Sequence, residues 1–157
     1  MQLDLIRTRH KGEKIDGQLL VDGQKLCDTS ECREGALQPG TYQVIRHFCH
    51  QYNRYVPLIQ VLSVKHVKRK APAQITSFCQ ACTKQKYVTN NSVLPMYCPQ
   101  LKMGNGIHGR NDGSIILGTR IIPGCLKHTR EPYENLSERI RKISGRGNEI
   151  TLTIKDI

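Results

Sequence analysis

Hydrophobic and polar positions alternate along the N-terminal third of the chain, a pattern that predicts β-strands. Within residues 2–8, Leu3 and Leu5 fall on one side of a strand. Residues 18–29 contain two short apolar stretches on either side of Asp22-Gly23, a dipeptide that favours a tight hairpin turn. The chain is therefore expected to begin with a strand that is followed by a β-hairpin.

Further strands are predicted where apolar and β-branched residues recur between turn signals. They cover residues 41–48, 55–64, 106–108, 114–119 and 148–155. The last of these has the clearest pattern, because Ile150, Leu152 and Ile154 face one way while Thr151 and Thr153 face the other. It is expected to be a closing strand of the same sheet.

Residues 131–144 are the one segment with helical periodicity. The apolar stripe consists of Tyr133, Leu136, Ile140 and Ile143. Pro132 suits the first turn, and Glu131 favours the positive end of the helix dipole. Gly145 is expected to end the helix.

Between residues 65 and 103 the periodic pattern decays, so this part is expected to hold little regular structure. We interpret residues 63–103 as a cysteine-containing insertion within a single domain that spans 1–157. The fold class that follows is mainly β (α+β), a small sheet or barrel-like domain with one C-terminal helix.

The composition agrees with one domain that has a lean core. The chain has 157 residues, 38% of them hydrophobic, and no tryptophan. No stretch approaches the roughly 20 apolar residues of a membrane-spanning helix, and the first residues lack the apolar block of a signal peptide. We therefore expect no membrane partner and a protein that is cytoplasmic as synthesised, with export only by a route that needs no signal peptide.

The net charge of +11 is concentrated in the middle of the chain. Residues 35–111 contain no Asp or Glu but ten Lys and Arg residues. Such a field attracts anions, so a nucleic acid, an acidic protein or an anionic cell-wall polymer would fit as partner. A solvated basic face is the alternative. The candidate anion-binding residues are Lys68, Arg69, Lys70 and Arg110.

Three of the seven cysteines have a spacing that suits zinc. Cys79 and Cys82 are separated by two residues, and Cys98 follows after fifteen intervening residues. A structural zinc would explain how the insertion stays ordered without a core of its own. Candidates for the fourth ligand are His66, Cys49 and His50. The alternative is three unrelated thiols.

A glycine-rich stretch over residues 105–118 carries candidate catalytic side chains. Glycines let backbone amides point at a ligand, and His108 could act as a general base toward Ser114. On residue types alone, a glycine-rich hairpin with a structural histidine is the commoner outcome. Cys125 is a further candidate nucleophile, although a small buried hydrophobic residue is the commoner role for such a cysteine.

The layout resembles a phage-associated bacterial family known as domain of unknown function 5675. The matching pieces are Leu5-Ile6-Arg7-Thr8, Gly17 to Gly23, Cys27 to Glu31, Leu37 to Val44, Ile107-His108, Gly113 to Gly118 and the helix–strand tail. The resemblance covers most of the chain outside residues 63–103.

That family is in turn similar to the catalytic domain of L,D-transpeptidases, whose cysteine thiolate attacks a peptidoglycan stem peptide. The resemblance implies that His108 matches the family histidine and that Gly113 precedes the nucleophile position, where Ser114 stands. Ile116 occupies the place of an arginine that usually follows, and Arg110 or Arg120 could substitute for it.

Two hypotheses from different classes follow. The first is a non-catalytic binding or structural module, of phage or mobile-element origin, whose basic surface docks an anionic partner on a transpeptidase-like scaffold. The second is a peptidoglycan-directed enzyme that carries out acyl transfer or hydrolysis with His108 and Ser114, or with Cys125. The serine at the nucleophile position favours the first hypothesis, because a hydroxyl needs a well-aligned base to react.

Overall fold

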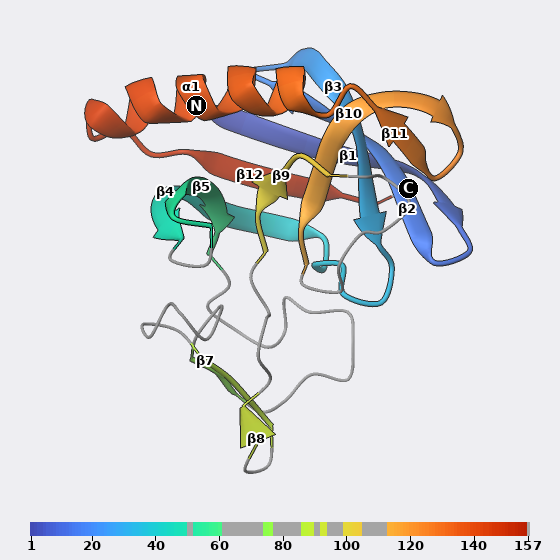
Figure 1. The fold of residues 1–157 in the computed structure, drawn as a ribbon, viewed down its shortest axis with the longest axis horizontal. Helices are drawn as coiled ribbons and strands as arrows, with labels where there is room; N and C mark the ends of the chain where they lie inside the picture. Colours follow the sequence, from blue (N-terminus) through green and yellow to red (C-terminus); the bar gives the residue numbers. More distant parts are fainter. Residues whose placement is uncertain are drawn as a thin grey trace.

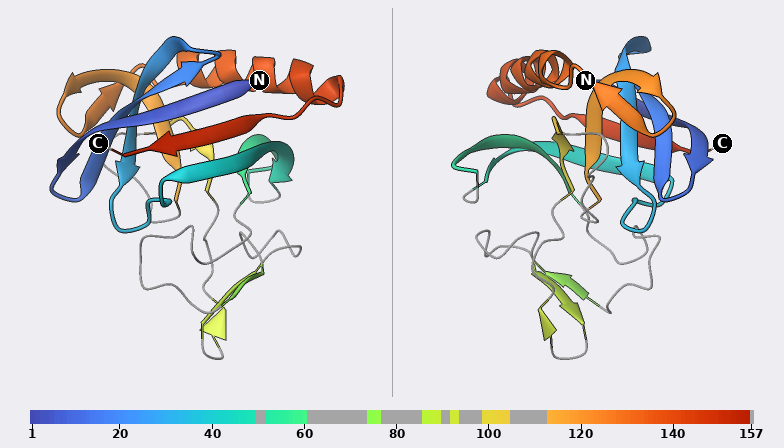
Figure 2. Two further views of the ribbon diagram at one scale, coloured as in Figure 1. Left: turned by 180° about the vertical axis from the view of Figure 1, so that it is seen from behind. Right: turned by 45° about the vertical axis from the view of Figure 1, so that its right-hand side comes forward.

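A single twisted β-sheet that curves into a nearly closed barrel forms the main part of the molecule, and one helix packs along it (Figures 1 and 2). The computed structural model describes residues 1–49, 52–60, 74–76, 86–89, 92–93, 99–104 and 113–156. The mainly β class predicted from the sequence, with one C-terminal helix, is confirmed.

The strands of the main sheet are β1 (Gln2–Lys11), β2 (Lys14–Val21), β3 (Gln24–Cys32), β4 (Gly40–Cys49), β5 (Arg54–Ile59), β9 (Leu101–Lys102), β10 (Ile115–Ile122), β11 (Cys125–Lys127) and β12 (Thr151–Lys155). Most of them overlap predicted segments, whereas β9 and β11 were not predicted and the predicted strand at residues 106–108 lies outside the described residues. The strand order is β11-β10-β3-β2-β1-β12-β4-β5, with β9 beside β10. The β1–β12 and β9–β10 pairs are parallel, and the other pairs of this sheet are antiparallel.

The β2–β3 hairpin turns where the sequence predicted. Asp22 and Gly23 both have positive φ, 48° and 82°, as a tight hairpin turn of the primed type requires. The alternation in β1 also holds, since Leu3 and Leu5 are fully buried in the core. Tyr42 and Val44 of β4 join the same core, as do Ile150, Leu152 and Ile154 at the other end of the chain.

In the part of the chain expected to hold little regular structure, the described residues include four short strands. A small sheet is formed by β6 (Gln74–Thr76), β7 (Lys86–Thr89) and β8 (Ser92–Val93), and Leu101–Lys102 belongs to the main sheet. The sequence did not indicate these strands, because elements of two to four residues are too short to show a hydrophobic period.

Residues 99–102 close the gap between β5 and β10. The amide of Ile59 donates a 2.9 Å hydrogen bond to the carbonyl of Pro99, and Leu58 forms an antiparallel bridge with Gln100. On the other side, the amide of Ile115 donates a 2.8 Å hydrogen bond to the carbonyl of Gln100. This closing segment joins the two ends of the sheet and covers what would otherwise be open strand edges.

The helix α1 (Arg130–Gly145) is one residue longer at each end than predicted. Tyr133, Leu136 and Ile140 form its buried face, as expected. Gly145 is the last residue of the helix, as predicted. The left-handed residue that closes the last turn is Gly147, whose φ of 72° allows amide hydrogen bonds back to that turn. Among the described residues, no helix has the length and apolar character needed to cross a bilayer.

The inward alternation of β1 continues past Leu5 to a charged residue. Arg7 is only 1% exposed and pairs with Glu31 of β3. Gly17 lies opposite Arg7 in the register of β1 and β2, and a Cβ there would stand 2.8 Å from both the carbonyl oxygen of Ile6 and the hydroxyl of Thr29. Glycine at this position thus makes room for the packing around the buried arginine.

Candidate functional site

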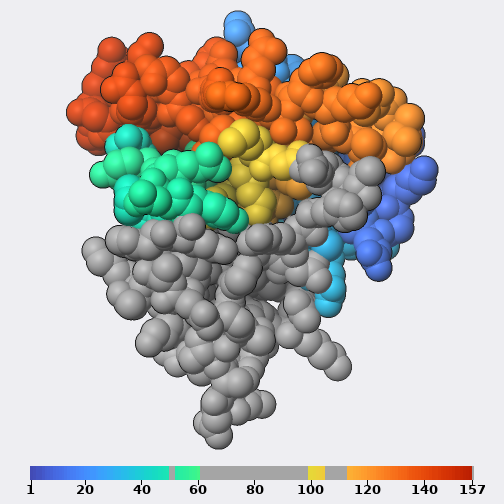
Figure 3. Space-filling model, viewed as in Figure 1, coloured from blue at the N-terminus to red at the C-terminus, as the bar shows by residue number. Residues whose placement is uncertain are grey.

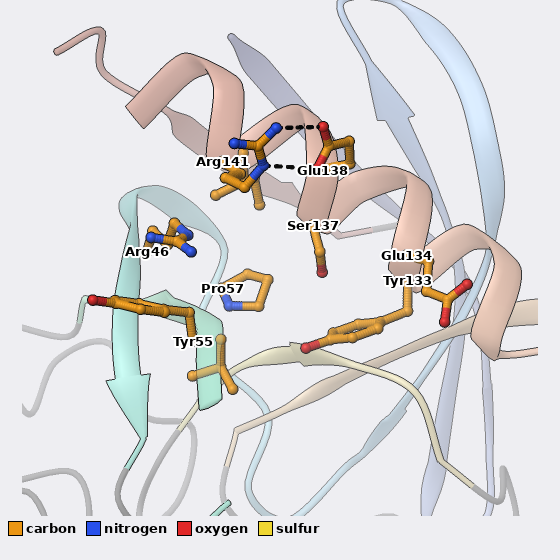
Figure 4. Close-up of a pocket in the computed structure, with 10 residues that line it drawn as sticks. Arg46, Tyr55, Pro57, Tyr133, Glu134, Ser137, Glu138 and Arg141 are labelled. Carbon is orange, nitrogen blue, oxygen red and sulfur yellow. Dashed lines mark hydrogen bonds and ion pairs between the residues drawn. The ribbon is translucent and has the colours of Figure 1, made fainter. Parts of the chain in front are cut away.

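A groove of about 230 Å³ lies between α1 and the β4–β5 hairpin, two elements that adjoin each other on the surface (Figures 3 and 4). It is lined by Arg46, Tyr55, Val56, Pro57, Tyr133, Glu134, Ser137, Glu138, Ile140 and Arg141. The hairpin contributes four of these residues and the helix six. One wall is therefore a pleated strand pair and the other a helix face.

The register of the hairpin builds the first wall. Arg46 lies opposite Pro57, and Phe48 lies opposite Tyr55, so these four side chains share one face of the strand pair. The guanidinium carbon of Arg46 lies 3.7 Å from the centroid of the Tyr55 ring. Phe48 packs edge-on against Tyr55 with ring centroids 5.3 Å apart. These contacts hold Tyr55 in place although half of its surface is exposed.

Helical spacing builds the second wall. Tyr133, Ser137 and Ile140 recur at intervals of four and three residues, so they lie on the same face of α1. Tyr133 and Ile140 are buried, and they anchor this face against the sheet. The hydroxyl of Ser137, between them, is buried and has no hydrogen-bond partner among the described residues. Figure 4 shows Ser137 pointing from the helix toward the hairpin.

The acidic residues of the groove are already paired. Glu138 accepts hydrogen bonds of 2.8 and 2.9 Å from Arg141, and this pairing lowers the pKa of Glu138 to about 2. Glu134 accepts a 2.7 Å hydrogen bond from Arg130. The helix carboxylates are thus matched by cations of the same helix.

The cations of the hairpin differ in this respect. Arg46 and Arg54 are exposed, and within the described part of the chain neither forms an ion pair. Arg54 instead lies near two aromatic rings, 5.6 Å from the centroid of Tyr52 and 5.7 Å from that of Tyr133. Among the residues that the structure describes, the groove therefore carries uncompensated positive charge on its hairpin side.

The predicted nucleophile Ser114 occupies a different place. It precedes β10 and follows Gly113, whose φ is 76°. Ser114 is 4% exposed, and its hydroxyl oxygen accepts a 3.2 Å hydrogen bond from the amide of Gln100 in the closing segment. His108 lies outside the described residues, so its pairing with Ser114 stays a prediction.

Two alternatives considered for the same chemistry can be placed. Cys125, the second candidate nucleophile, is half-buried at the start of β11. Arg120 was one of two candidates to replace the family arginine. Its guanidinium lies 3.4 Å from the carboxylate of Asp16 and donates a hydrogen bond to the carbonyl of Thr29. In this position Arg120 ties β10 to β2 and β3.

The remaining predicted site residues lie outside the described part of the chain. They are Lys68, Arg69, Lys70 and Arg110 for anion binding, Cys79, Cys82 and Cys98 for zinc, and His50 and His66 as further ligands. Cys49, also considered as a fourth zinc ligand, is described and is 1% exposed. Among the described residues, no three His, Cys, Asp or Glu side chains are grouped so that they could hold a metal ion.

Sequence reasoning missed the groove itself. Arg46 and Arg54 lie within the acid-free segment, and two tyrosines flank Arg54 within residues 52–55, so a basic and aromatic hairpin was visible in the sequence. The helix wall was not, because Tyr133 is far from the hairpin along the chain and meets it only in the folded protein.

In comparisons with known proteins, no family model, no curated protein and no solved structure matches this chain. The resemblance to the phage-associated family and to L,D-transpeptidases therefore stays a prediction.

Proposed function

We propose that this protein is a non-catalytic binding module that docks an anionic partner through a basic surface that includes Arg46 and Arg54. The observation that carries the proposal is the guanidinium of Arg46, which is exposed, stacked on Tyr55 and without a carboxylate partner among the described residues. Residues 35–111, which contain both arginines, have ten basic residues and no acidic one. The positive charge of this segment is therefore not balanced by any acidic residue within it.

The stacking supports a binding role over a merely solvated face. A freely moving arginine loses rotamer entropy when it binds, whereas a guanidinium already held against a ring loses less. The contact with Tyr55 leaves the N–H groups of Arg46 available, because a cation–π interaction uses the face of the guanidinium and not its edge. Arg46 is therefore preoriented for an anion.

The position of Ser114 supports the absence of catalysis. A nucleophile must reach its substrate, and the side chain of Ser114 is buried while its oxygen accepts a backbone hydrogen bond. We propose a transpeptidase-like scaffold of phage or mobile-element origin on the sequence resemblance, with its pocket chemistry replaced by binding. Peptidoglycan acyl transfer by His108 and Ser114 remains the alternative that labelling experiments address.

Charge neutralisation tests the proposal. Binding of the wild type to single-stranded DNA, polyglutamate and polyphosphate is measured by fluorescence anisotropy over a series of salt concentrations. We expect log K for at least one polymer to fall linearly with log salt. In the double variant Arg46→Gln/Arg54→Gln, the slope of log K against log salt should become less steep. For single-stranded DNA the decrease should be roughly 0.7 for each phosphate that the variant no longer neutralises.

A matched double variant controls for net charge. Arg33→Gln/Arg139→Gln removes the same charge from two exposed arginines that do not line the groove. It should bind nearly as the wild type does. Equal weakening by both double variants, or no salt-dependent binding to any of the three polymers, would overturn the proposal.

A further inference from the structure

The groove has room for one flat group. Its volume of about 230 Å³ lies below the roughly 300–1,000 Å³ of pockets that enclose a drug-sized ligand. Tyr55 and Tyr133 come from opposite walls, with Pro57 and Ser137 between them (Figure 4). A single planar ring inserted from outside could contact both walls while the rest of its molecule stays on the surface.

Polar groups are divided between the two walls. The hairpin side has the cation Arg46, stacked on Tyr55, and Arg54 lies near Tyr133. The helix side has the buried hydroxyl of Ser137 and the carboxylates of Glu134 and Glu138, which accept hydrogen bonds from Arg130 and Arg141 of the same helix. A carboxylate paired in this way still has oxygen lone pairs that can accept, so a ligand with an anion at one end and hydrogen-bond donors on its ring matches the groove.

We infer that the anionic partner is a single-stranded nucleic acid, that the groove receives one of its bases, and that Arg46 and Arg54 contact the neighbouring phosphates. This inference rests on the proposed function. Bases stack on aromatic rings and on guanidinium planes, and Arg46 over Tyr55 presents both in one stack. Base amino groups can donate to the oxygens of the helix wall, while the phosphates lie toward the hairpin.

The same division of charge disfavours an acidic peptide. Its side chains bring carboxylates and no donors, so a side chain that entered the groove would offer no hydrogen bond to the remaining lone pairs of Glu134 and Glu138. A duplex is disfavoured as well, because its bases are stacked and paired, and unstacking them is unfavourable. A base of a single strand has no pairing to break and so costs less to insert.

The test compares two strands of equal charge. End-labelled decamers of deoxyadenylate and of abasic deoxyribose phosphate are titrated with the full-length protein. The intact strand should bind roughly 5- to 150-fold more tightly than the abasic strand, the range expected for stacking of one base. Tyrosine fluorescence should be quenched by the intact strand alone, and the signal is readable because the protein has no tryptophan.

Variants locate the base in the groove. Tyr55→Leu replaces a half-exposed ring, so the fold should survive, and it should remove most of the difference between the two strands. Ser137→Phe should do the same by filling the groove. Tyr52→Leu makes the same substitution on the same hairpin outside the groove lining, and the difference should persist in it.

Each contrary result has its own meaning. Equal binding of the intact and abasic strands overturns the base site but leaves the anion-binding function standing. Tighter binding of a ten-residue polyglutamate than of the intact strand overturns the choice of nucleic acid. Equal loss in Tyr55→Leu and Tyr52→Leu overturns the location, whereas absence of salt-dependent binding to every anion overturns the proposed function itself.

Discussion

The guanidinium of Arg7 donates two hydrogen bonds of 2.8 Å to the two carboxylate oxygens of Glu31, inside the barrel. The same guanidinium donates a 2.7 Å hydrogen bond to the carbonyl of Leu37 and lies 3.3 Å from the carboxylate of Asp156. The pair therefore joins β1 and β3 to the turn before β4 and to the end of the chain. A buried pair of this kind is costly to break on one side, because the remaining charge is left uncompensated.

We predict that Glu31→Gln destabilises the protein by about 3–5 kcal/mol in urea unfolding. The double variant Arg7→Met/Glu31→Leu, which removes both charges and keeps the volume apolar, should recover most of that loss. If the double variant loses as much stability as Arg7→Met and Glu31→Leu lose together, the two side chains are not energetically coupled.

Ser114→Ala tests the tie between β10 and the closing segment. The amide of Gln100 loses the hydroxyl that accepts its hydrogen bond, so the free energy of unfolding should fall by about 1 kcal/mol.

The wild-type protein should remain unlabelled by acylating probes. Labelling of wild type at Ser114 that disappears in Ser114→Ala, and also in His108→Ala, would instead support the enzymatic alternative.

We predict that the buried thiol of Cys27 makes the protein less stable at alkaline pH. Burial raises the pKa of its thiol from about 9 to about 12. The unfolded chain therefore loses this proton at a lower pH than the native protein does. The stability that Cys27 contributes is full below pH 9, and it is lost progressively as the pH rises toward 12. Cys27→Val should flatten this decline in urea unfolding between about pH 8 and 10.5. The slope that remains should include Tyr42, whose pKa burial also raises.

Two glycines at the end of α1 should respond in opposite ways to the same substitution. Gly147→Ala places a side chain at a φ of 72° and should lower the free energy of unfolding by about 1 kcal/mol. Gly145→Ala lies in the last helical turn with nothing within 4 Å of the added Cβ, so it should be neutral or stabilise by about 0.5–1 kcal/mol. Thermal unfolding of both variants distinguishes these outcomes.

The predicted zinc site has a direct readout. If Cys79, Cys82 and Cys98 hold zinc, elemental analysis should find about one equivalent in the purified protein. Chelation should then increase hydrogen exchange within residues 63–103 before it affects the main sheet. Protein that contains no zinc, with an exchange pattern that a chelator does not alter, would show that the cysteines serve another purpose.

Local patterns in the sequence predict the longer strands and the helix, but not the strands of two to four residues. Leu3 and Leu5 point inward, Asp22-Gly23 turns the first hairpin, and the stripe from Tyr133 to Ile140 packs against the sheet, all as local periodicity and turn chemistry predict. These features depend on residues that are close together in the chain, and so their pattern carries the information.

How these elements meet depends on contacts that exist only in the folded protein. The parallel pairing of β1 with β12, the closure by Gln100, the burial of Arg7 with Glu31 and the groove between Tyr55 and Tyr133 all join residues distant in sequence. No local pattern encodes such partners. Each arises because the whole sheet must bury its apolar face and pair its backbone groups at once, which fixes the neighbours only when every element is in place.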